Sequence, residues 1–343
     1  MRTLAIDIGS GTQDVLYWIE GREVENCPRF ILPSPAVMVS QRIERATRRG
    51  QNIYLYGENM GGGFKGVLRR HMGAGLKVAS HPSSALAISD NLERVKEMGI
   101  EIVELPPPGF YPIYLADFSP EFWRVFLGQV GLEYPHVVLV AAQDHGFYPQ
   151  KSNREGRFEI WRGFLDSGGD IWDLIYEVPP PYLTRLVTIH RLTGGWPVAD
   201  TGGAAILGAL FDEKVEETSH SKGICVVNVG NSHVVAFLIF RERVYGIYEH
   251  HTSLLSGEKL WTHLERFRRG ELSHEEVFED RGHGCAWKRP PTEARDFPQT
   301  YVIGPRRDML LGYPVDFIYP GSDMMITGAL GLIKGFVRRY KRC

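Results

Sequence analysis

Several features that would assign a protein to a broad class are scarce or missing in this sequence. Its 343 residues contain four widely separated cysteines, Cys27, Cys225, Cys285 and Cys343. We therefore expect no disulfide framework and a reducing, cytoplasmic setting. No apolar run reaches membrane-spanning length, and Asp7 interrupts the only apolar run near the N-terminus, so neither a membrane partner nor a signal peptide is expected. The net charge is −2 with both signs interspersed, which does not favour nucleic-acid binding.

Two common phosphate-binding signatures are also missing. No segment fits G-x-x-x-x-G-K-[ST], which excludes a P-loop. Gly9-Ser10-Gly11 and Gly73-Ala74-Gly75 both lack the third glycine of the dinucleotide fingerprint. A chain of this length is sufficient for about two domains, each with a substantial core.

What is present begins with a predicted strand, glycine turn and second strand over residues 4–19. Leu4–Ile8 and Val15–Ile19 are apolar runs, and Gly9-Ser10-Gly11-Thr12 lies between them. The two glycines would allow positive φ and turn backbone N–H groups toward one point, which creates an anion site. Asp7, at the end of the first strand, would hold a magnesium ion through its waters. A hairpin with an exposed acid is the alternative.

The pattern occurs a second time over residues 224–248. Asn228 takes the place of Asp7 and Gly230 that of Gly9, and His233 lies near the position of Thr12. The second loop would therefore be Gly230-Asn231-Ser232-His233. An internal repeat of this kind implies two similar domains whose loops face each other across a cleft. Such a cleft suits the phosphate tail of a nucleotide.

These landmarks resemble the actin, chaperone and sugar-kinase (ASKHA) superfamily, whose first phosphate loop is an Asp-x-Gly-Ser/Gly-x-Thr hairpin like Asp7 to Thr12. Residues 200–210 and 321–331 look like its connecting and closing helices. The resemblance implies α/β architecture with two ribonuclease-H-like (actin-like ATPase) domains and an interdomain nucleotide cleft. The first domain would span residues 1–199 with a long, irregular insertion, the second 200–320, and a closing helix 321–343. ATP and Mg²⁺ are the implied cofactors, with Gly304 under the base and Arg306 near the ring or ribose.

Polar residues follow the buried strand predicted over residues 136–142, at the sheet edge where α/β proteins bind ligands. Gln143, His145 and Gly146 resemble the Gln-x-His-Gly strand end that contacts the sugar in FGGY carbohydrate kinases. This resemblance implies that Gln143, Asp144 and His145 bind substrate. The alternative is a satisfied histidine and acid in a loop.

Asp200 resembles the general base of the same kinases, but it lies one residue further from the Ala-Ala pair at 204–205. One residue rotates a helix position by about 100°. The alternative role for Asp200 is that of a helix N-cap.

Two other segments raise hypotheses. Residues 83–98 and 121–130 are predicted helices within the insertion. His283 and Cys285, with His250 or His251, form a candidate metal site, although their spacing fits no standard zinc pattern.

The leading functional hypothesis is an ATP-dependent phosphotransferase acting on a small hydroxylated metabolite, with Asp200 as base and Asp7 near the metal. One alternative is an ATPase that activates or senses a protein client. Another is a nucleotide-binding protein without turnover, because Asn228 and His233 depart from the superfamily pattern. Relatives of this sequence are often labelled pyruvate formate-lyase activating proteins. The C-x-x-x-C-x-x-C cluster of radical enzymes is absent, so that label does not imply radical chemistry here.

Overall fold

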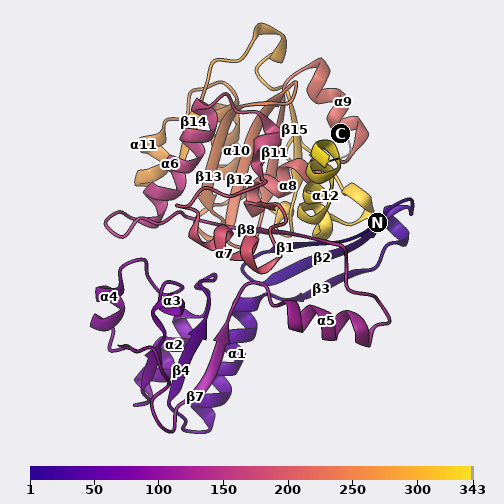
Figure 1. The fold of residues 1–343 in the computed structure, drawn as a ribbon. Helices are drawn as coiled ribbons and strands as arrows, with labels where there is room; N and C mark the ends of the chain where they lie inside the picture. Colours follow the sequence, from indigo (N-terminus) through magenta and orange to yellow (C-terminus); the bar gives the residue numbers. More distant parts are fainter. Residues whose placement is uncertain (341–343) are drawn as a thin grey trace.

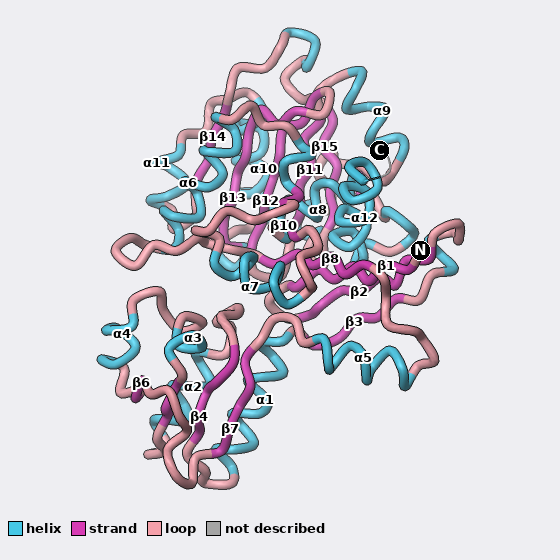
Figure 2. The backbone as a smooth tube through the Cα atoms, in the orientation of Figure 1, coloured by secondary structure: helices cyan, strands magenta, loops and turns pink. Residues whose placement is uncertain are grey.

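The computed structural model describes residues 1–340, and residues 341–343, which include Cys343 and the end of the predicted closing helix, lie outside that part. The architecture is mixed α/β with three sheets (Figure 1). Two six-stranded sheets form the upper body in this view, and a four-stranded sheet forms a separate lobe below them (Figure 2).

The first sheet contains the predicted N-terminal hairpin. The strands β1 and β2 pair antiparallel, and Asp7 lies opposite Asp14. On its other side β1 pairs in parallel with β8. In spatial order the strands are β3 (Arg29–Pro33), β2 (Thr12–Ile19), β1 (Arg2–Ile8), β8 (Val137–Ala142), β10 (Val198–Ala199) and β9 (Ile175–Tyr176).

The second sheet repeats this pattern of pairing. Its strands β11 and β12 form an antiparallel hairpin, β13 adds to β12, and β15 pairs in parallel with β11. Asn228 lies opposite Val235, as Asp7 lies opposite Asp14. In spatial order the strands are β14 (Gly284–Trp287), β13 (Arg243–His251), β12 (His233–Phe240), β11 (Ile224–Val229), β15 (Gln299–Ile303) and β16 (Asp316–Phe317).

The segment predicted as an irregular insertion is instead a folded α/β lobe, so that expectation was wrong. Its sheet has four parallel strands, which lie side by side in the order β6 (Glu101–Ile102), β5 (Val78–Ser80), β4 (Ile53–Gly57) and β7 (Tyr111–Leu115). The lobe has its own hydrophobic core. Its strands are two to five residues long. Strands over residues 52–56 and 100–103 are predictable from the sequence, whereas β5 and β7 do not stand out from the surrounding loops.

Four helices cover this lobe: α1 (Pro35–Arg48), α2 (Lys65–Gly73), α3 (Pro82–Ala85) and α4 (Leu92–Glu97). The single helix predicted over residues 83–98 is therefore wrong. The chain leaves the helix after Ala85 and starts another at Asn91, whose side chain accepts hydrogen bonds from the N–H groups of Glu93 and Arg94. The helix predicted over residues 121–130 is confirmed as α5 (Pro120–Gln129).

The remaining helices surround the two large sheets (Figure 1). Buried side chains of α8 and α12 belong to the same core as residues from both sheets, whereas α5 and α7 pack on the first sheet and α10 on the second. Their bounds are α6 (Asn153–Asp166), α7 (Thr184–Leu192), α8 (Thr201–Ala209), α9 (Glu213–Ser221), α10 (Gly257–Arg268), α11 (His274–Glu279) and α12 (Thr327–Tyr340). Among residues 1–340, no helix combines the length and apolar character needed to cross a membrane.

The contact between α8 and α12 depends on glycine. A Cβ added to Gly331 would lie 1.9 Å from the carbonyl oxygen of Ala204, and one added to Gly208 would lie 1.8 Å from that of Thr327. A Cβ on Gly328 would lie 2.0 Å from the Asp7 carboxylate. These contacts explain why glycines, which weaken a helix, occur in the middle of both helices. They also bring α12 directly against the end of β1.

We predict that Gly331→Ala lowers the free energy of unfolding by about 1–3 kcal/mol, because the added methyl group overpacks a backbone contact. Gly163→Ala in α6 is the matched control, since a Cβ there meets nothing within 4 Å. The control should leave stability unchanged or raise it by up to about 1 kcal/mol through helix propensity. Urea denaturation of both variants measures the difference. Equal free energies of unfolding for Gly331→Ala and Gly163→Ala would show that α8 and α12 can move apart to fit the methyl group without cost.

Candidate functional site

The two predicted loops have the same backbone turn. The N–H of Gly9 donates to the carbonyl of Thr12 at 2.9 Å, and the N–H of Gly230 donates to that of His233 at 2.9 Å. The positive φ expected for Gly9 and Gly11 is wrong, because neither is among the glycines with positive φ. Close approach is the reason for glycine instead. A Cβ would lie 3.3 Å from the Thr12 oxygen at Gly9 and 2.8 Å from the His233 oxygen at Gly230.

The turns of the two sheets meet. The Ser232 hydroxyl donates to the Ser10 hydroxyl at 2.7 Å, although the two residues are 222 positions apart. Both turns line one cavity of about 510 Å³, within the range of small-molecule sites. The cavity brings together most of the predicted site residues, namely Asp7, Gly9, Ser10, Gly11, Thr12, Gln143, Asp144, His145, Gly230, Asn231, Ser232, His233 and Gly304.

Two predicted residues do not line this cavity. Arg306 is exposed and its N–H donates to the Val229 carbonyl. Asp200 is buried behind the wall, 5% exposed. Gly304 lies at the wall with φ +100°, and a Cβ there would come within 2.5 Å of the Asn228 side chain. Only glycine fits easily at this position.

Two carboxylates sit beside the first turn. Asp7 accepts a hydrogen bond from the Thr201 hydroxyl at 2.5 Å. Burial raises the pKa of Asp7 to about 8 and that of Asp14 to about 7. Asp14 Oδ1 is buried without a hydrogen-bond partner among the described residues. Sequence reasoning missed Asp14, although its position across the hairpin from Asp7 follows from the strand pairing.

Behind the cavity lies an ion-pair network that the sequence did not predict. Arg157 of α6 donates to both oxygens of Asp200, at 2.5 and 2.8 Å, and its Nε donates to Glu249 of β13 at 3.0 Å. Glu249 also accepts from Trp161 at 2.6 Å and from Gln143 at 2.9 Å. The network therefore joins both sheets through α6, which follows β8 in the chain yet packs on β13 and β14.

The network is electrostatically coupled. Burial alone would raise the pKa of Glu249, but the Arg157 guanidinium, aided by the Trp161 hydrogen bond, holds that pKa well below its usual range. Burial alone would likewise lower the pKa of Arg157, but Asp200 and Glu249 raise it. Glu249 and Arg157 are thus both charged in the folded protein. The one sequence signal for Glu249 was its position as a lone acid directly after the apolar run 244–248.

The predicted catalytic and substrate residues are engaged in this framework. Asp200 accepts from the N–H of Gly202 at 2.9 Å, so it is the N-cap of α8 that the alternative interpretation described. Asp144 accepts from the N–H groups of Gly146 and Leu186. His145 differs, because its Nδ1 is buried with no partner among the described residues.

The candidate metal group differs from the predicted one. The Nε2 of His250 forms a hydrogen bond with the Asp280 carboxylate at 2.9 Å. Cys285 packs in the hydrophobic core, where burial raises its pKa to about 12. Neither residue belongs to the group of potential metal ligands found in the described part of the chain. That group consists of His233, His251 and His283.

We predict that Arg157→Met lowers the free energy of unfolding by about 3–5 kcal/mol, because two carboxylates would remain buried without a cation. Arg162→Met is the control on the exposed side of the same helix and should change stability by less than about 0.5 kcal/mol. The double variant Arg157→Met/Glu249→Gln should lose less than the sum of the single losses. Similar stability of the two arginine variants would contradict the role assigned to the network.

Comparison with solved structures finds distant likeness. The ethanolamine utilization protein EutJ from Carboxydothermus hydrogenoformans is 10% identical with a TM-score of 0.29, over 97% of this chain and 89% of that one. A PilM-PilN type IV pilus biogenesis complex is 10% identical with a TM-score of 0.36, over 98% of both chains. A nucleotide-free acetone carboxylase is 9% identical with a TM-score of 0.23, over 72% of this chain and 45% of that one. These TM-scores are too low to support conclusions.

The chain matches no curated protein. A family model does match, over residues 60–309. The matched range contains the insertion lobe from its middle onward, the ion-pair network, the second turn and the three histidines. As the sequence predicted, this chain belongs to the family described as "Putative pyruvate format-lyase activating enzyme (DUF1786)".

Proposed function

We propose that this protein is a nucleotide-dependent phosphotransferase of the ASKHA type, which binds ATP between its two turns and transfers the γ-phosphoryl group to a small hydroxylated molecule. The observation that carries the proposal is the meeting of two equivalent turns from two equivalent sheets in one cavity, with Ser10 and Ser232 in contact. Backbone N–H groups and hydroxyls from both sides would surround the phosphates.

The proposal includes a classification of the two large sheets as ribonuclease-H-like domains. In each sheet, three antiparallel strands (β1 to β3, and β11 to β13) are followed by two strands parallel to the first (β8 and β10, and β15 and β16). The sheets differ at their edges, where the first ends in antiparallel β9 and the second carries antiparallel β14 beside β13. In each, the turn after the first strand faces the cavity. The adenosine would lie toward Gly304, whose backbone lines the cavity, while Arg306 would approach from the exposed rim.

Magnesium fits the residues at the first turn. Asp7 and Asp14 are neighbouring half-buried carboxylates, and one buried oxygen of Asp14 has no hydrogen-bond partner among residues 1–340. Oxygen ligands of this kind suit Mg²⁺, which would neutralise phosphate charge when bound. Asn228 and Val235 occupy the corresponding positions in the second sheet and offer no carboxylate. We therefore propose that Asp7 and Asp14 together hold the magnesium side of the site.

The acceptor would bind where the cavity continues toward the insertion lobe. Gly61, Gly62 and Lys65 of that lobe line the cavity together with Gln143 and His145. Burial lowers the pKa of Lys65, which indicates a partly desolvated ammonium group. A desolvated cation beside glycine backbone favours an acceptor that carries an anionic group.

Asp200 has a different proposed role from the one predicted from sequence. Because both of its oxygens bind Arg157, proton abstraction by Asp200 would require this pair to open. We propose that Asp200 positions Arg157 and the start of α8. Its role as general base stays a prediction that a kinetic test can address.

We expect Gly9→Val to abolish the thermal stabilisation that ATP confers, because the side chain would enter a turn that already has a 3.3 Å contact at Cβ. Gly163→Val, where a Cβ meets nothing within 4 Å, is the matched control and should keep the stabilisation. Thermal melts with and without ATP and magnesium measure the effect. An ATP-induced shift that survives in Gly9→Val would place the nucleotide elsewhere.

Asp7→Asn and Asp14→Asn should each lower magnesium-dependent ATP turnover by about 10²-fold or more, since each removes a charged metal contact. Asn228→Ala should change it little. Labelled ATP, incubated with and without a panel of small hydroxylated anions, reports both transfer and hydrolysis. ATP hydrolysis that none of the acceptors stimulates would instead favour an ATPase acting on a protein partner. ATP binding without any turnover would favour a non-hydrolysing nucleotide-binding protein.

A further inference from the structure

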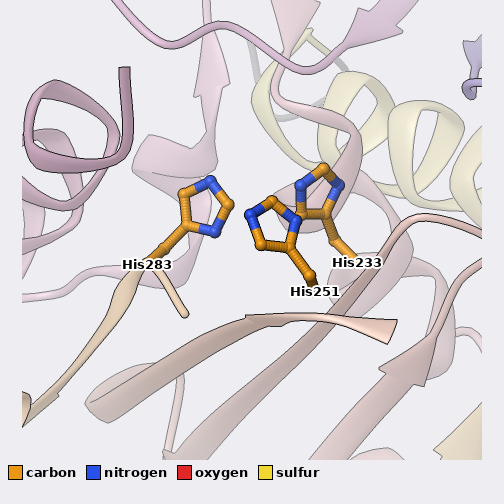
Figure 3. Close-up of side chains that lie close together, drawn as sticks. All are labelled: His233, His251 and His283. Atoms are coloured by element: carbon orange, nitrogen blue, oxygen red, sulfur yellow. The ribbon is translucent and has the colours of Figure 1, made fainter. Parts of the chain in front are cut away.

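Three histidines from three neighbouring segments converge at one end of the second sheet. His233 begins β12, His251 ends β13 directly opposite it, and His283 immediately precedes β14. The N–H of His283 donates to the Glu249 carbonyl at 3.0 Å, which ties this segment to β13. Figure 3 shows the three rings turned toward one another. Strand pairing therefore fixes the positions from which all three side chains project.

The distances fit a common metal ion. The ring centroids are 4.8 Å apart for His233 and His251, 5.0 Å for His233 and His283, and 4.7 Å for His251 and His283. One ligand atom from each residue lies within 4.8 Å of the others. Tetrahedral zinc with bonds of about 2.0–2.1 Å places its ligand nitrogens about 3.4 Å apart. Small side-chain rotations would close that difference.

The burial of the cluster also suits coordination. His283 is buried, and His233 and His251 are half-buried. The Nδ1 of His283, a residue only 1% exposed, has no hydrogen-bond partner within residues 1–340. Such a nitrogen costs stability unless a ligand satisfies it.

Charges of both signs lie near the cluster. Glu249 is two residues from His251 and pairs with Arg157, which also binds Asp200. The Arg154 guanidinium donates to the Gly282 carbonyl at 2.9 Å, beside His283. Two acids therefore face two arginines, and it is the arrangement of the three imidazoles that favours a metal ion.

We propose that His233, His251 and His283 bind a divalent transition-metal ion of the zinc class, with one coordination position left open toward the cleft. Imidazole nitrogen is a ligand that zinc prefers and magnesium does not. Three protein ligands with a fourth open position are typical of catalytic rather than structural zinc. The open position would take water or an oxygen of a bound small molecule.

The location of the cluster gives that open position its direction. His233 lines the cavity, and the ring of His145, also in the cavity wall, stacks on His283 at a centroid distance of 6.3 Å. The unpartnered Nδ1 of His145 would be within reach of a molecule bound at the metal. This metal site is separate in residues and in chemistry from the carboxylate pair Asp7 and Asp14.

The test uses the full-length protein without nucleotide. After chelation, the protein is titrated with Zn²⁺ and with Co²⁺, whose visible absorption reports tetrahedral nitrogen coordination. We expect one equivalent per chain. His251→Gln and His283→Gln should weaken binding by more than the about 10–100-fold that loss of an outer-shell partner costs. His220→Gln, on the exposed surface of α9, is the matched control and should bind as the unmodified protein does.

Binding of less than a stoichiometric amount by the unmodified protein, or equal affinity in His251→Gln and His220→Gln, would overturn the proposal. Circular dichroism of the metal-free variants shows that each is folded. His251 is partly exposed, so its substitution is tolerable even where that of buried His283 disrupts folding. Since no nucleotide is present, failure here leaves the proposed ATP site untouched, and failure of ATP binding leaves this site untouched.

Discussion

The site depends on the buried contact of one arginine with two acids. Arg157 connects Asp200, at the start of α8, with Glu249 on β13, and it is 1% exposed. Desolvating three charged groups costs several kcal/mol per ion, and only good geometry with further hydrogen bonds offsets that cost. Trp161 and Gln143 provide those bonds. Together with the core that α8 and α12 share with both sheets, the contact joins the two sheets behind the cavity.

This constraint also limits which chemistry each acid can perform. A carboxylate held by two guanidinium hydrogen bonds is fixed in position, and both of its oxygens are occupied. Asp200 is therefore better suited to orient the start of α8, where Thr201 donates to Asp7. In this way the ion-pair network at the back of the cavity is connected through two adjacent residues to the first turn at its front.

The strand pairing explains which parts of the site could be predicted from the sequence. Apolar runs around Gly9 and Gly230 identified both turns, since local alternation is sufficient to find a hairpin. Arg157 and Glu249 are 92 residues apart, and no local pattern connects them. The metal prediction was right about His283 and the alternative His251, but wrong about Cys285 and His250, and it missed His233. Alternation along β13 sends His250 toward Tyr248 and His251 toward His233, and Gly284, with φ +149°, turns the chain between His283 and Cys285.

The two halves of the repeat have diverged in the ions that they suit. Asp7, Thr12 and Asp14 in the first half correspond to Asn228, His233 and Val235 in the second, as the equal hairpin registers require. Two carboxylates and a hydroxyl in the first half thus correspond to an amide, an imidazole and an apolar group in the second. The backbone of His233 still completes the turn, with its carbonyl accepting from Gly230, while its ring points to His251 and His283 (Figure 3). Under the two proposals made above, this one residue would support the phosphate-binding turn through its main chain and the metal through its side chain, because the two directions do not compete.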